Sequence, residues 1–521
     1  MGFESILDLK EPVKGVTRPA LFLDLNVDQI IERITKNSPK KTDYYEYFPL
    51  DAECENYRRM IFRDIKKNSL YEPLQAFCVK YGEYKELEAK KEDTRVDVQE
   101  PIWHFCAIKV YTDALLELLE ALQGADLESE GLLSLRDYLK AYTSREEFVY
   151  INRVSEELAE EMDGLVVEAS YENGRVVVSV SSGEEEKTDE DEDDDDPNKK
   201  DYAEYEEFLR YFDPGNEKTF VNPFSKVYYL TGFEQEIVKN VEKKNPGLFK
   251  KADKLLEDHE KYEDKVFLRL ADELGFYLCY YEFEKKMKDA GFAFCEPSRN
   301  ENEKISADDL YDLALACVNL EKDKPVVSNG FYYDDKDLFF VLTGPNQGGK
   351  TTFARSMGQL VYFTKIGLDV PAKKANVHWF SDILTHFSVE ESVETGRGKL
   401  MEELVRLSPM MKRESSNSFV VINELFTTAA NFDAIIMGKN VLSHFIREGC
   451  HGIYVTHLRE LCDVDERVAG LSAQLDENRV QNFKILRSGV DYVGCAENQI
   501  IKFGLGYEKL SERLKERLGK A

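Results

Sequence analysis

The sequence has no paired cysteines, no recognisable leader and no long apolar run. Its nine cysteines are scattered with no C-x-x-C pair, a spacing that fits neither a zinc site nor a disulfide framework and that suits a reducing cytoplasm. No signal peptide is visible, and the myristoylation pattern is incomplete because Ile6 stands where Ser or Thr is required. No apolar stretch is long enough to cross a bilayer. We therefore expect a cytoplasmic protein with no membrane partner.

Positive charge is scarce. The 521 residues include 69 Lys and Arg against 100 Asp and Glu, which gives a formal net charge of −31. This balance argues against a basic nucleic-acid coat protein and against binding to anionic membranes, although it leaves room for a local DNA contact. Hydrophobic residues make up 42% and aromatic residues 12%, which excludes a wholly disordered chain. The length exceeds one ordinary core, so we expect two to four domains.

The chain divides into four segments by pattern. Residues 1–150 are predicted to be mostly helical, with an apolar stripe at helical spacing in 102–122. Helical patterns return in 236–324, where 255–287 predicts a long helix interrupted by Gly275. Long helices on both sides of an insertion suggest a lever, although a helical scaffold without a special role is the alternative. Residues 325–521 alternate apolar strands, at 338–342, 419–422 and 452–455, with helices, which predicts an α/β domain around a mostly parallel sheet.

The insertion, residues 151–235, is the most acidic part of the chain. It begins with two strand-like runs, 165–172 and 175–180, on either side of Asn173-Gly174, the pair that favours a type I′ hairpin turn. Residues 184–196 then contain eleven acids and one lysine. We expect this stretch to be a disordered, solvated tether rather than a metal site. With 8 Lys and Arg against 25 Asp and Glu, the insertion carries a net charge of −17.

A glycine-rich motif follows the first strand expected in the α/β domain. It has the form G-x-x-x-x-G-K-T, the P-loop, in which backbone N–H groups and the start of a helix hold phosphate oxygens. We expect Lys350 to neutralise the β- and γ-phosphates and the Thr351 hydroxyl to bind Mg²⁺. A chance match in a glycine-rich loop is the alternative. The ATP-binding residues predicted on this basis are Gly344, Pro345, Asn346, Gln347, Gly348, Gly349, Lys350, Thr351 and Thr352.

Two later strands end in further candidate residues. The run 419–422 leads into Asn423 and Glu424, where a Walker B motif usually has an Asp before its acid. Asn423 can hold a magnesium-bound water, and Glu424 can orient the water that attacks ATP. The alternative is that Glu424 caps a strand and Asn423 marks an inactive site. His457 follows the third strand, where it can reach the γ-phosphate, although a lone histidine is more often structural.

Residues 343–372 closely resemble the ATPase domain of the MutS DNA mismatch-repair family, an ABC-type P-loop ATPase. The resemblance rests on the Gly-Pro-Asn-x-Gly-Gly-Lys form of the loop and on 366–367 and 370–372, and it extends over about 325–515. Within this stretch, residues 381–385 are similar to the next strand of the family's ATPase domain. Asn423-Glu424 corresponds to the family's Asp-Glu pair, and Thr456-His457 corresponds to its Thr-His pair. Residues 503–505 are similar to its closing element. Upstream, 24–30 and 57–64 resemble the lever region of compact bacterial MutS-type ATPases, in which a clamp is inserted between long helices.

The sequence departs from this family pattern in four ways. The residues before the P-loop are too few for the mismatch-reading and connector domains plus the levers, and no G-x-F-x-E wedge is present. The acidic insertion is unlike a DNA clamp, which should offer cations to phosphates. Gly398, within 396–399, stands where the family has the serine that acts on the partner's nucleotide; a glycine N–H or Lys399 is the candidate substitute. Residues 426–429 replace the Gly-Arg-Gly-Thr run after the Asp-Glu.

The resemblance implies a slow, Mg²⁺-dependent ATPase that works as a homodimer through its ATPase domains. It also implies a DNA-binding or DNA-repair function on mismatched or structured DNA, which the charge does not support. The alternative is a MutS-derived nucleotide switch that acts on protein partners without DNA, and the acidic insertion favours it. A third candidate, an SMC-like ATPase, is weaker because coiled-coil arms are missing.

Overall fold

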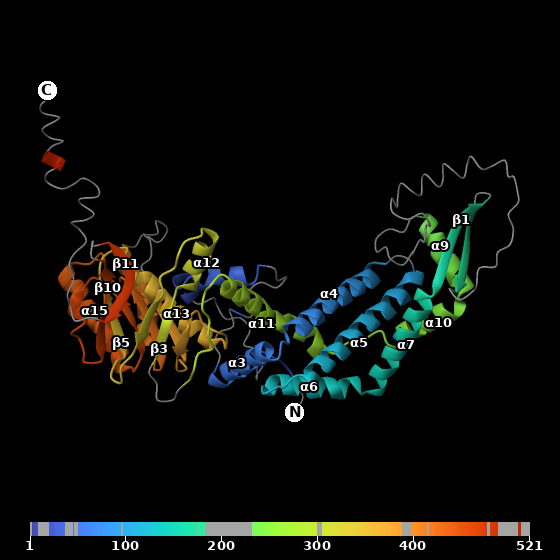
Figure 1. The fold of residues 1–521 in the computed structure, drawn as a ribbon, viewed down its shortest axis with the longest axis horizontal. Coiled ribbons are helices and arrows are strands. Elements are labelled where there is room, and N and C mark those ends of the chain that lie inside the picture. The colour runs from blue at the N-terminus through green and yellow to red at the C-terminus, as the bar shows by residue number, and fades with distance from the viewer. Residues whose placement is uncertain are drawn as a thin grey trace, which may run out of the picture. The chain divides into compact units, whose positions relative to one another are not determined.

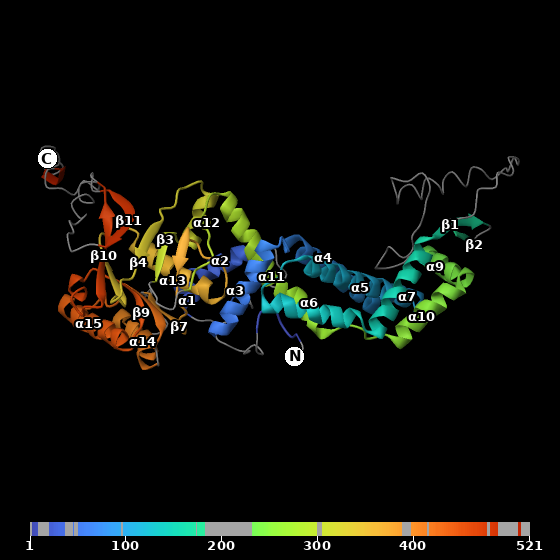
Figure 2. The same ribbon diagram turned by 60° about the horizontal axis from the view of Figure 1, so that its bottom comes forward.

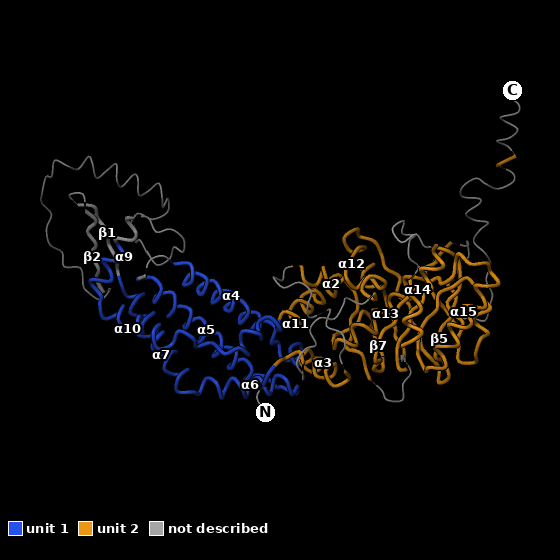
Figure 3. The backbone as a smooth tube through the Cα atoms, turned by 180° about the vertical axis from the view of Figure 1, so that it is seen from behind, with its two compact units in different colours: residues 1–4, 64–274 blue, residues 5–63, 275–521 orange. Residues whose placement is uncertain are grey.

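The computed structural model describes residues 3–8, 20–36, 45, 51–94, 97–172, 175–182, 232–299, 305–387, 398–413, 416–476, 480–487 and 509–511. For residues 97, 166–172, 175–182 and 232–236 it describes the backbone only. The chain forms two compact units (Figure 3): unit 1 comprises residues 1–4 and 64–274, and unit 2 comprises residues 5–63 and 275–521. Helices α3 (Ala52–Lys67) and α11 (Lys265–Asp289) contribute residues to both units. The division of the sequence into four functional segments stays a prediction.

Unit 1 is a bundle of helices that carries a β-hairpin (Figure 1). Helix α5 packs along α4 and also contacts α6, α7 and α10. The apolar stripe predicted in 102–122 is confirmed as the buried face of α5, which includes Ala114, Leu115 and Leu118. The remaining elements of the unit are α4 (Tyr71–Asp93), the 3-10 turn Asp97–Gln99, α5 (Glu100–Gly124), α6 (Glu130–Thr143), α7 (Glu146–Asp163), α9 (Gly232–Lys244) and α10 (Pro246–Asp258).

The predicted hairpin is confirmed. Strands β1 (Leu165–Glu172) and β2 (Arg175–Ser182) pair antiparallel, from Leu165 opposite Ser182 to Glu172 opposite Arg175. The register leaves two residues between the strands, as a two-residue hairpin loop requires. The Asn173-Gly174 turn itself and the acidic stretch 184–196 lie outside the described residues.

The prediction of a helix interrupted at Gly275 is wrong. Helix α11 runs through Gly275, and the break falls earlier, between α10 and α11. Burial of Leu274 and Phe276 on either side outweighs the cost of a glycine within a helix, about 1 kcal/mol. The break is fixed by Asp264, whose carboxylate accepts from the Val266 N–H at 2.8 Å and whose own N–H donates to the Tyr111 hydroxyl at 3.0 Å.

Unit 2 is built around a six-stranded sheet with strand order β11-β10-β5-β9-β8-β7 (Figure 2). All neighbours are parallel except the edge pair β10–β11. The predicted α/β domain and its three buried strands are therefore confirmed, as is the strand expected at 381–385. The strands are β5 (Phe339–Thr343), β7 (Asp382–Phe387), β8 (Ser418–Asn423), β9 (His451–Val455), β10 (Val468–Leu475) and β11 (Gln481–Arg487).

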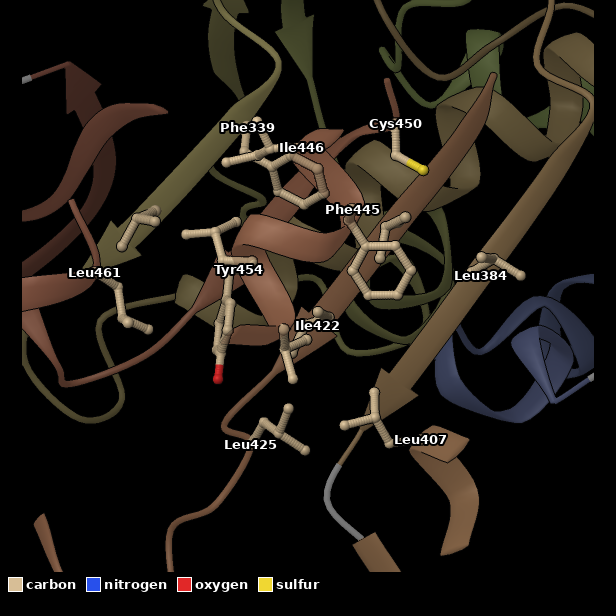
Figure 4. Close-up of a cluster of buried hydrophobic side chains, with 14 of the residues drawn as sticks. Phe339, Leu384, Leu407, Ile422, Leu425, Phe445, Ile446, Cys450, Tyr454 and Leu461 are labelled. Atoms are coloured by element: carbon tan, nitrogen blue, oxygen red, sulfur yellow. The ribbon is translucent and has the colours of Figure 1, made fainter. Parts of the chain in front are cut away.

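Helices cover the sheet of unit 2. Helix α13 (Lys350–Lys365) contacts β7, β8 and β9, and α14 (Lys399–Lys412) contacts β7 and α15 (Asn431–Arg447). Side chains of α14, α15 and the central strands form one buried cluster (Figure 4). A second, three-stranded sheet has the order β4-β3-β6. The further elements are α1 (Leu21–Asp24), α2 (Val27–Ile34), β3 (Ser306–Leu310), α12 (Leu313–Glu321), β4 (Asn329–Tyr332), β6 (Lys374–Asn376) and the 3-10 turn η2 (Arg459–Leu461).

Membrane-spanning helices were sought over the described ranges. None of the helices there combines the length and the apolar character that a bilayer crossing requires.

Candidate nucleotide-binding site

The glycine-rich motif connects β5 to α13, as its sequence predicts. Gly349, just before the first residue of α13, has φ +85°, a left-handed conformation that favours glycine. Gly344, just after β5, has φ +137°, and a Cβ there would lie 2.8 Å from the Cβ of Ala473 on β10. The loop thus follows a course that side chains at these two positions would obstruct. Helix α13 begins directly after Gly349, and the first N–H groups of a helix have no partner within the helix, which makes its N-terminus suited to hold an anion.

Lys350 is folded back into this loop. Its ammonium group donates hydrogen bonds of 2.9 Å to the carbonyl oxygens of Gly344 and Pro345, and the side chain is buried. Burial lowers the pKa of Lys350, and the charge of Glu424 opposes that shift. The two carbonyls offer no full negative charge. An anion held in the loop would supply the counter-charge that this cation needs.

Thr351 and Asn423 come together at the carboxyl end of the sheet. The Thr351 hydroxyl donates to Asn423 Oδ1 at 2.9 Å. Thr351 lies in the first turn of α13, and Asn423 is the last residue of β8. Two uncharged side-chain oxygen atoms therefore lie beside the P-loop. Oxygen donors of this kind suit Mg²⁺, which binds few protein groups and completes its shell with water and phosphate oxygens.

Glu424 lies directly beyond β8 with a left-handed backbone, φ +53°. Its N–H donates to the Val455 carbonyl of β9 at 2.9 Å, and its Oε1 lies 3.6 Å from Nε2 of His457. The His457 imidazole is the largest cause of a lowered pKa of Glu424, and Lys350 and Lys399 add to it while burial opposes it. The carboxylate is therefore ionised at neutral pH and able to accept a proton or a hydrogen bond from water.

These groups line a cavity of about 480 Å³ in unit 2. Of the predicted residues, Asn346 to Thr352 and Glu424 form its wall. Gly344 and Pro345 contribute the carbonyls that hold Lys350, and Asn423 reaches the site through Thr351. His457 stands behind Glu424 and not in the wall itself. The structure thus brings every predicted site residue to one end of the sheet, while their roles stay predictions.

The other half of the cavity wall was not anticipated from the sequence. It is largely apolar and comes from β3, α12, the segment before β4, and β11. These residues are scattered along the chain and have no motif spacing, so no sequence signal marks them. They are Leu310, Tyr311, Leu315, Pro325, Val326, Val327 and Phe483, with the polar Asp312, Asn319 and Asn329, and α13 adds Phe353 and Ser356.

Phe483 is placed in the cavity wall by the backbone of β11. It has φ +59°, an uncommon conformation for a bulky residue. The Asn329 side chain donates to the Phe483 carbonyl at 3.1 Å and accepts from the Ile485 N–H at 2.8 Å, which fixes β11 beside β4. A Cβ at Gly349 would lie 3.4 Å from the Phe483 ring. The aromatic ring therefore borders the phosphate loop directly.

Residues 396–399, in which Gly398 stands where the MutS family has a serine, are described only from Gly398 onward. Gly396 and Arg397 lie outside the described residues. Gly398 precedes the first turn of α14, and the space where its Cβ would stand is open. Lys399 begins α14, and its charge contributes to the lowered pKa of Glu424. A cation thus stands near Glu424 within the same chain. Its expected action on a partner's nucleotide stays a prediction, and the closing element at 503–505 lies outside the described residues.

Residues 340–492 match the family model described as MutS domain V. The chain is 24% identical to the DNA mismatch repair protein MutS of Chlorobium phaeovibrioides over 34% of its own length and 21% of that protein's. It is 31% identical to MutS of Thermotoga neapolitana over 27% and 17% of the two lengths. It is 25% identical to human Msh3 over 36% and 16%. The chain therefore spans only about a fifth of the length of the curated relatives that it matches.

Proposed function

We propose, from the match of residues 340–492 to the MutS domain V, that the protein is an ABC-type ATPase that binds ATP in the cavity formed by the P-loop and hydrolyses it with Mg²⁺. The observation that carries the proposal is the convergence of Lys350, the Thr351–Asn423 pair and Glu424 on one cavity. The loop N–H groups and Lys350 bind the phosphates. Bound Mg²⁺, held through Thr351 and Asn423, neutralises charge that develops on the phosphate oxygens.

The apolar half of the cavity binds the nucleoside. Val326, Val327 and Leu315 provide a surface on which a flat base is removed from water, and Phe483 adds an aromatic ring beside the loop. Pockets for small ligands commonly combine such an apolar lining with a few polar groups that set orientation. A cavity with a charged end and an apolar end matches a nucleoside triphosphate, which has charged phosphates at one end and a largely apolar base at the other.

Glu424 orients the water that attacks the γ-phosphate. Its carboxylate is ionised, lines the cavity and lies next to His457, whose imidazole holds it in place. Hydrolysis breaks the bond between the γ-phosphorus and the β,γ-bridging oxygen, and the water oxygen becomes part of the released phosphate. This chain supplies the positioning and the electrostatic stabilisation that such a transfer requires.

The protein acts as a homodimer through its ATPase domains. Exposed apolar side chains on α14 and α15 support this part of the proposal. They are Met401, Leu404 and Val405 on α14 and Phe432 and Ile436 on α15. Residues three or four apart share one face of a helix, so each helix exposes apolar side chains on one face, as helices at protein–protein interfaces commonly do. The exposed residues of α14 follow directly after Gly398 and Lys399, which stand at the start of that helix.

The dimer uses ATP to control binding to DNA, in a repair function. This part rests on the name of the relatives, DNA mismatch repair protein MutS, and on the resemblance of the N-terminal region to levers. A second candidate function is a nucleotide switch for protein partners. The net charge of −17 in the insertion favours it, because an acidic clamp repels phosphate backbones.

The test is the Mg²⁺-dependent ATPase rate of the purified chain, measured alone and with mismatched, branched and fully paired DNA. We expect ATP turnover that depends on Lys350, so that Lys350→Ala abolishes ATP binding while its folding is unchanged. Stimulation or inhibition by one DNA structure supports the repair function. ATP turnover that no DNA affects, at low as well as moderate salt, favours the protein switch. Full ATP affinity in Lys350→Ala would contradict the site assignment.

A further inference from the structure

Glu403 on α14 is a buried acid that the family motif does not explain. Its side chain has no exposed surface, and its neighbours along the helix, Leu400 and Leu407, belong to or pack against the hydrophobic cluster of unit 2. A carboxyl group in such surroundings needs a hydrogen-bond donor to be stable there. Its Oε2 accepts from the backbone N–H of Phe426 at 3.0 Å. Phe426 lies two residues after Glu424.

The loop that receives this hydrogen bond is strained. Glu424 and Phe426 both have left-handed backbones, with φ of +53° and +63°, a conformation that is unfavourable for side chains other than glycine. Such a backbone persists only where its surroundings hold it. The Glu424 N–H is held by the Val455 carbonyl at 2.9 Å, and the Phe426 N–H is held by Glu403. Glu403 therefore supplies a side-chain hydrogen bond that holds the turn carrying the Glu424 side chain.

Glu403 reaches this turn from the face of the sheet opposite to α13. His386, Ile422 and Tyr454 are in register across β7, β8 and β9, so their side chains share one face. Nε2 of His386 lies 3.3 Å from the Glu403 carbonyl oxygen, which places α14 over that face. Asn423, the next residue after Ile422, points to the other face and meets Thr351 of α13. Figure 4 shows the Tyr454 hydroxyl directed toward the end of the sheet where Leu425 lies.

Helix α14 is itself fixed at this end of the sheet. One turn after Glu403, the Arg406 guanidinium donates to the Phe387 carbonyl at 3.1 Å and pairs with the Asp24 carboxylate. Leu407 packs into the cluster with Leu425 and Phe426. The position of Glu403 is therefore determined by contacts on both sides of it along the helix. A displacement of α14 would move Glu403 and, through its hydrogen bond, the turn at Phe426.

We propose that Glu403 is a positioning residue for Glu424: by accepting the Phe426 N–H it holds the strained turn that aims the Glu424 carboxylate into the nucleotide cavity. The inference rests on the proposed function, in which Glu424 orients the attacking water. The group required at position 403 is a hydrogen-bond acceptor of the right length, and its charge is not required. The hydrogen bond also connects the helix that starts at Gly398 and Lys399 to the catalytic turn.

The experiment compares three substitutions at position 403, which separate the effect of side-chain length and hydrogen-bond acceptor from the effect of charge. Glu403→Gln keeps the length and a carbonyl acceptor, so kcat for Mg·ATP stays within about twofold of the wild type. Glu403→Met removes the acceptor at similar volume, and Glu403→Asp keeps the charge but is one methylene too short. Both lower kcat about 10- to 100-fold, the loss expected from misplacing a reacting group by about 1 Å. The Kd for ATP, measured with a fluorescent ATP analogue, changes less than twofold. Glu448→Met, the same change at an exposed acid directly after α15, is the control and leaves kcat unchanged.

A double substitution shows whether Glu403 acts through Glu424. If it does, Glu403→Met lowers the activity of the Glu424→Gln protein no further, because the carboxylate that it positions is already gone. Multiplicative losses in the double variant would overturn the proposal, as would an equal loss in Glu403→Gln and Glu403→Met. Should Glu403→Met not fold, the Gln and Asp variants still give the comparison.

Hydrogen exchange at the Phe426 amide provides a readout that does not depend on turnover. The exchange rate rises in Glu403→Met and Glu403→Asp and stays at the wild-type level in Glu403→Gln. An unchanged rate in all three variants would overturn the proposed hydrogen bond whatever the activity. A wild-type chain without ATPase activity, or a fully active Glu424→Gln protein, contradicts the proposed function instead, and the exchange data then show separately whether Glu403 holds the turn.

Discussion

At the residue scale, an uncharged side chain and a charged one stand next to each other at the end of β8. Asn423 accepts from Thr351 at 2.9 Å, and Glu424 beside it keeps its carboxylate ionised through His457. Asn423 meets Thr351 of α13, whereas the Glu424 carboxylate lines the cavity beside His457, because the left-handed backbone of Glu424 ends the alternation of the strand. In the proposed function, binding and hydrolysis of ATP depend on different groups, so substitutions should separate them.

Glu424→Gln should bind ATP with nearly the wild-type affinity and hydrolyse it about 100-fold more slowly or less. The amide keeps the shape of the side chain but no longer accepts a proton or a strong hydrogen bond from the attacking water. The measurement pairs an equilibrium ATP-binding curve with single-turnover phosphate release. We further expect ATP to trap the variant as a dimer, visible as a doubled mass in light scattering. Wild-type turnover would show that Glu424 is structural and that another group activates the water.

Asn423→Asp should preserve the Mg²⁺-dependent ATPase rate or raise it by a few-fold at most. A carboxylate still accepts from Thr351 and holds magnesium-bound waters more firmly than an amide, while Thr351 and the phosphates already provide part of the site. A Mg²⁺ titration of kcat measures the effect, with a lower half-saturating Mg²⁺ concentration expected. A large fall in activity would mean that the turn with Phe426 and Ala429 requires a neutral side chain at position 423.

At the element scale, the short helix α1 makes hydrogen bonds to three other elements of unit 2, namely β7, α13 and α14. The buried Asp24 carboxylate accepts from the Thr385 hydroxyl of β7 at 2.7 Å and pairs with Arg406 of α14. Its carbonyl accepts from Arg355 of α13 at 2.9 Å, and Gln359 of α13 donates to the Leu25 carbonyl at 2.8 Å. Helix α13 has Gly358 at the contact, where a Cβ would lie 2.6 Å from the Leu25 side chain. Residues near the N-terminus thus belong to the same unit as the nucleotide cavity.

Asp24→Asn should lower the free energy of unfolding of unit 2 by about 1–3 kcal/mol. The amide still accepts from Thr385 but no longer balances the charge of Arg406, and hydrogen bonds to charged groups are worth about this much. The shift of the urea midpoint, followed by loss of bound ATP analogue, measures the change. Glu32→Gln, which removes an exposed acid on α2, is the control and should stay within about 0.5 kcal/mol of the wild type. Equal midpoints for all three proteins would show that the Asp24 contacts add no stability.

The exposed apolar side chains of α14 and α15 lead to a prediction about dimerisation. Phe432 is 73% exposed, so Phe432→Glu should not affect folding but should raise the dimer Kd at least about tenfold, because a charge would be buried in an apolar contact. The dimer Kd is measured by sedimentation of the ATP-bound Glu424→Gln protein with and without Phe432→Glu. Val79→Glu changes a similarly exposed apolar residue on α4 of unit 1 and serves as the control. Dimerisation that is insensitive to Phe432→Glu would place the interface elsewhere.

At the scale of the whole molecule, the charge is unevenly distributed. The insertion 151–235 carries −17 of the net −31, and eleven of its acids lie within 184–196. Such a concentration repels a phosphate backbone within about 8 Å, the Debye length at physiological salt. If the hairpin β1–β2 is the tip of a clamp, the acidic stretch opposes DNA binding by electrostatics alone.

Removal of 184–196 should leave the ATPase rate unchanged and strengthen DNA binding, most strongly at low salt. The measurement is the DNA Kd over a salt series for the wild type and for the deletion. A variant with a Gly/Ser segment of the same length is the control for chain connectivity. Absence of DNA binding in all three proteins would contradict the clamp and favour the switch for protein partners. Unfolding of the deletion variant would show that the stretch is not a tether.

Much of this fold and site follows from local sequence. The hairpin is encoded by a two-residue turn between β-branched runs, the buried strands by continuous apolar residues, and the phosphate loop by glycines between a strand and a helix. Each of these signals lies within about ten neighbouring residues. Glu424 and His457 were identifiable for the same reason, since each directly follows a buried strand and the carboxyl ends of parallel strands meet at one edge.

Only the tertiary structure determined the rest, because those features depend on contacts between residues far apart in sequence. The break before α11 comes from Asp264 meeting Tyr111 and not from Gly275. The apolar wall of the cavity joins Val326 to Phe483, and no periodicity relates the two. Glu403 has the ordinary place of an acid in the first turns of a helix, and only burial against the Phe426 N–H distinguishes it. Sequence specifies which groups are available for chemistry, whereas the free energy of burying and pairing distant side chains decides which of them meet.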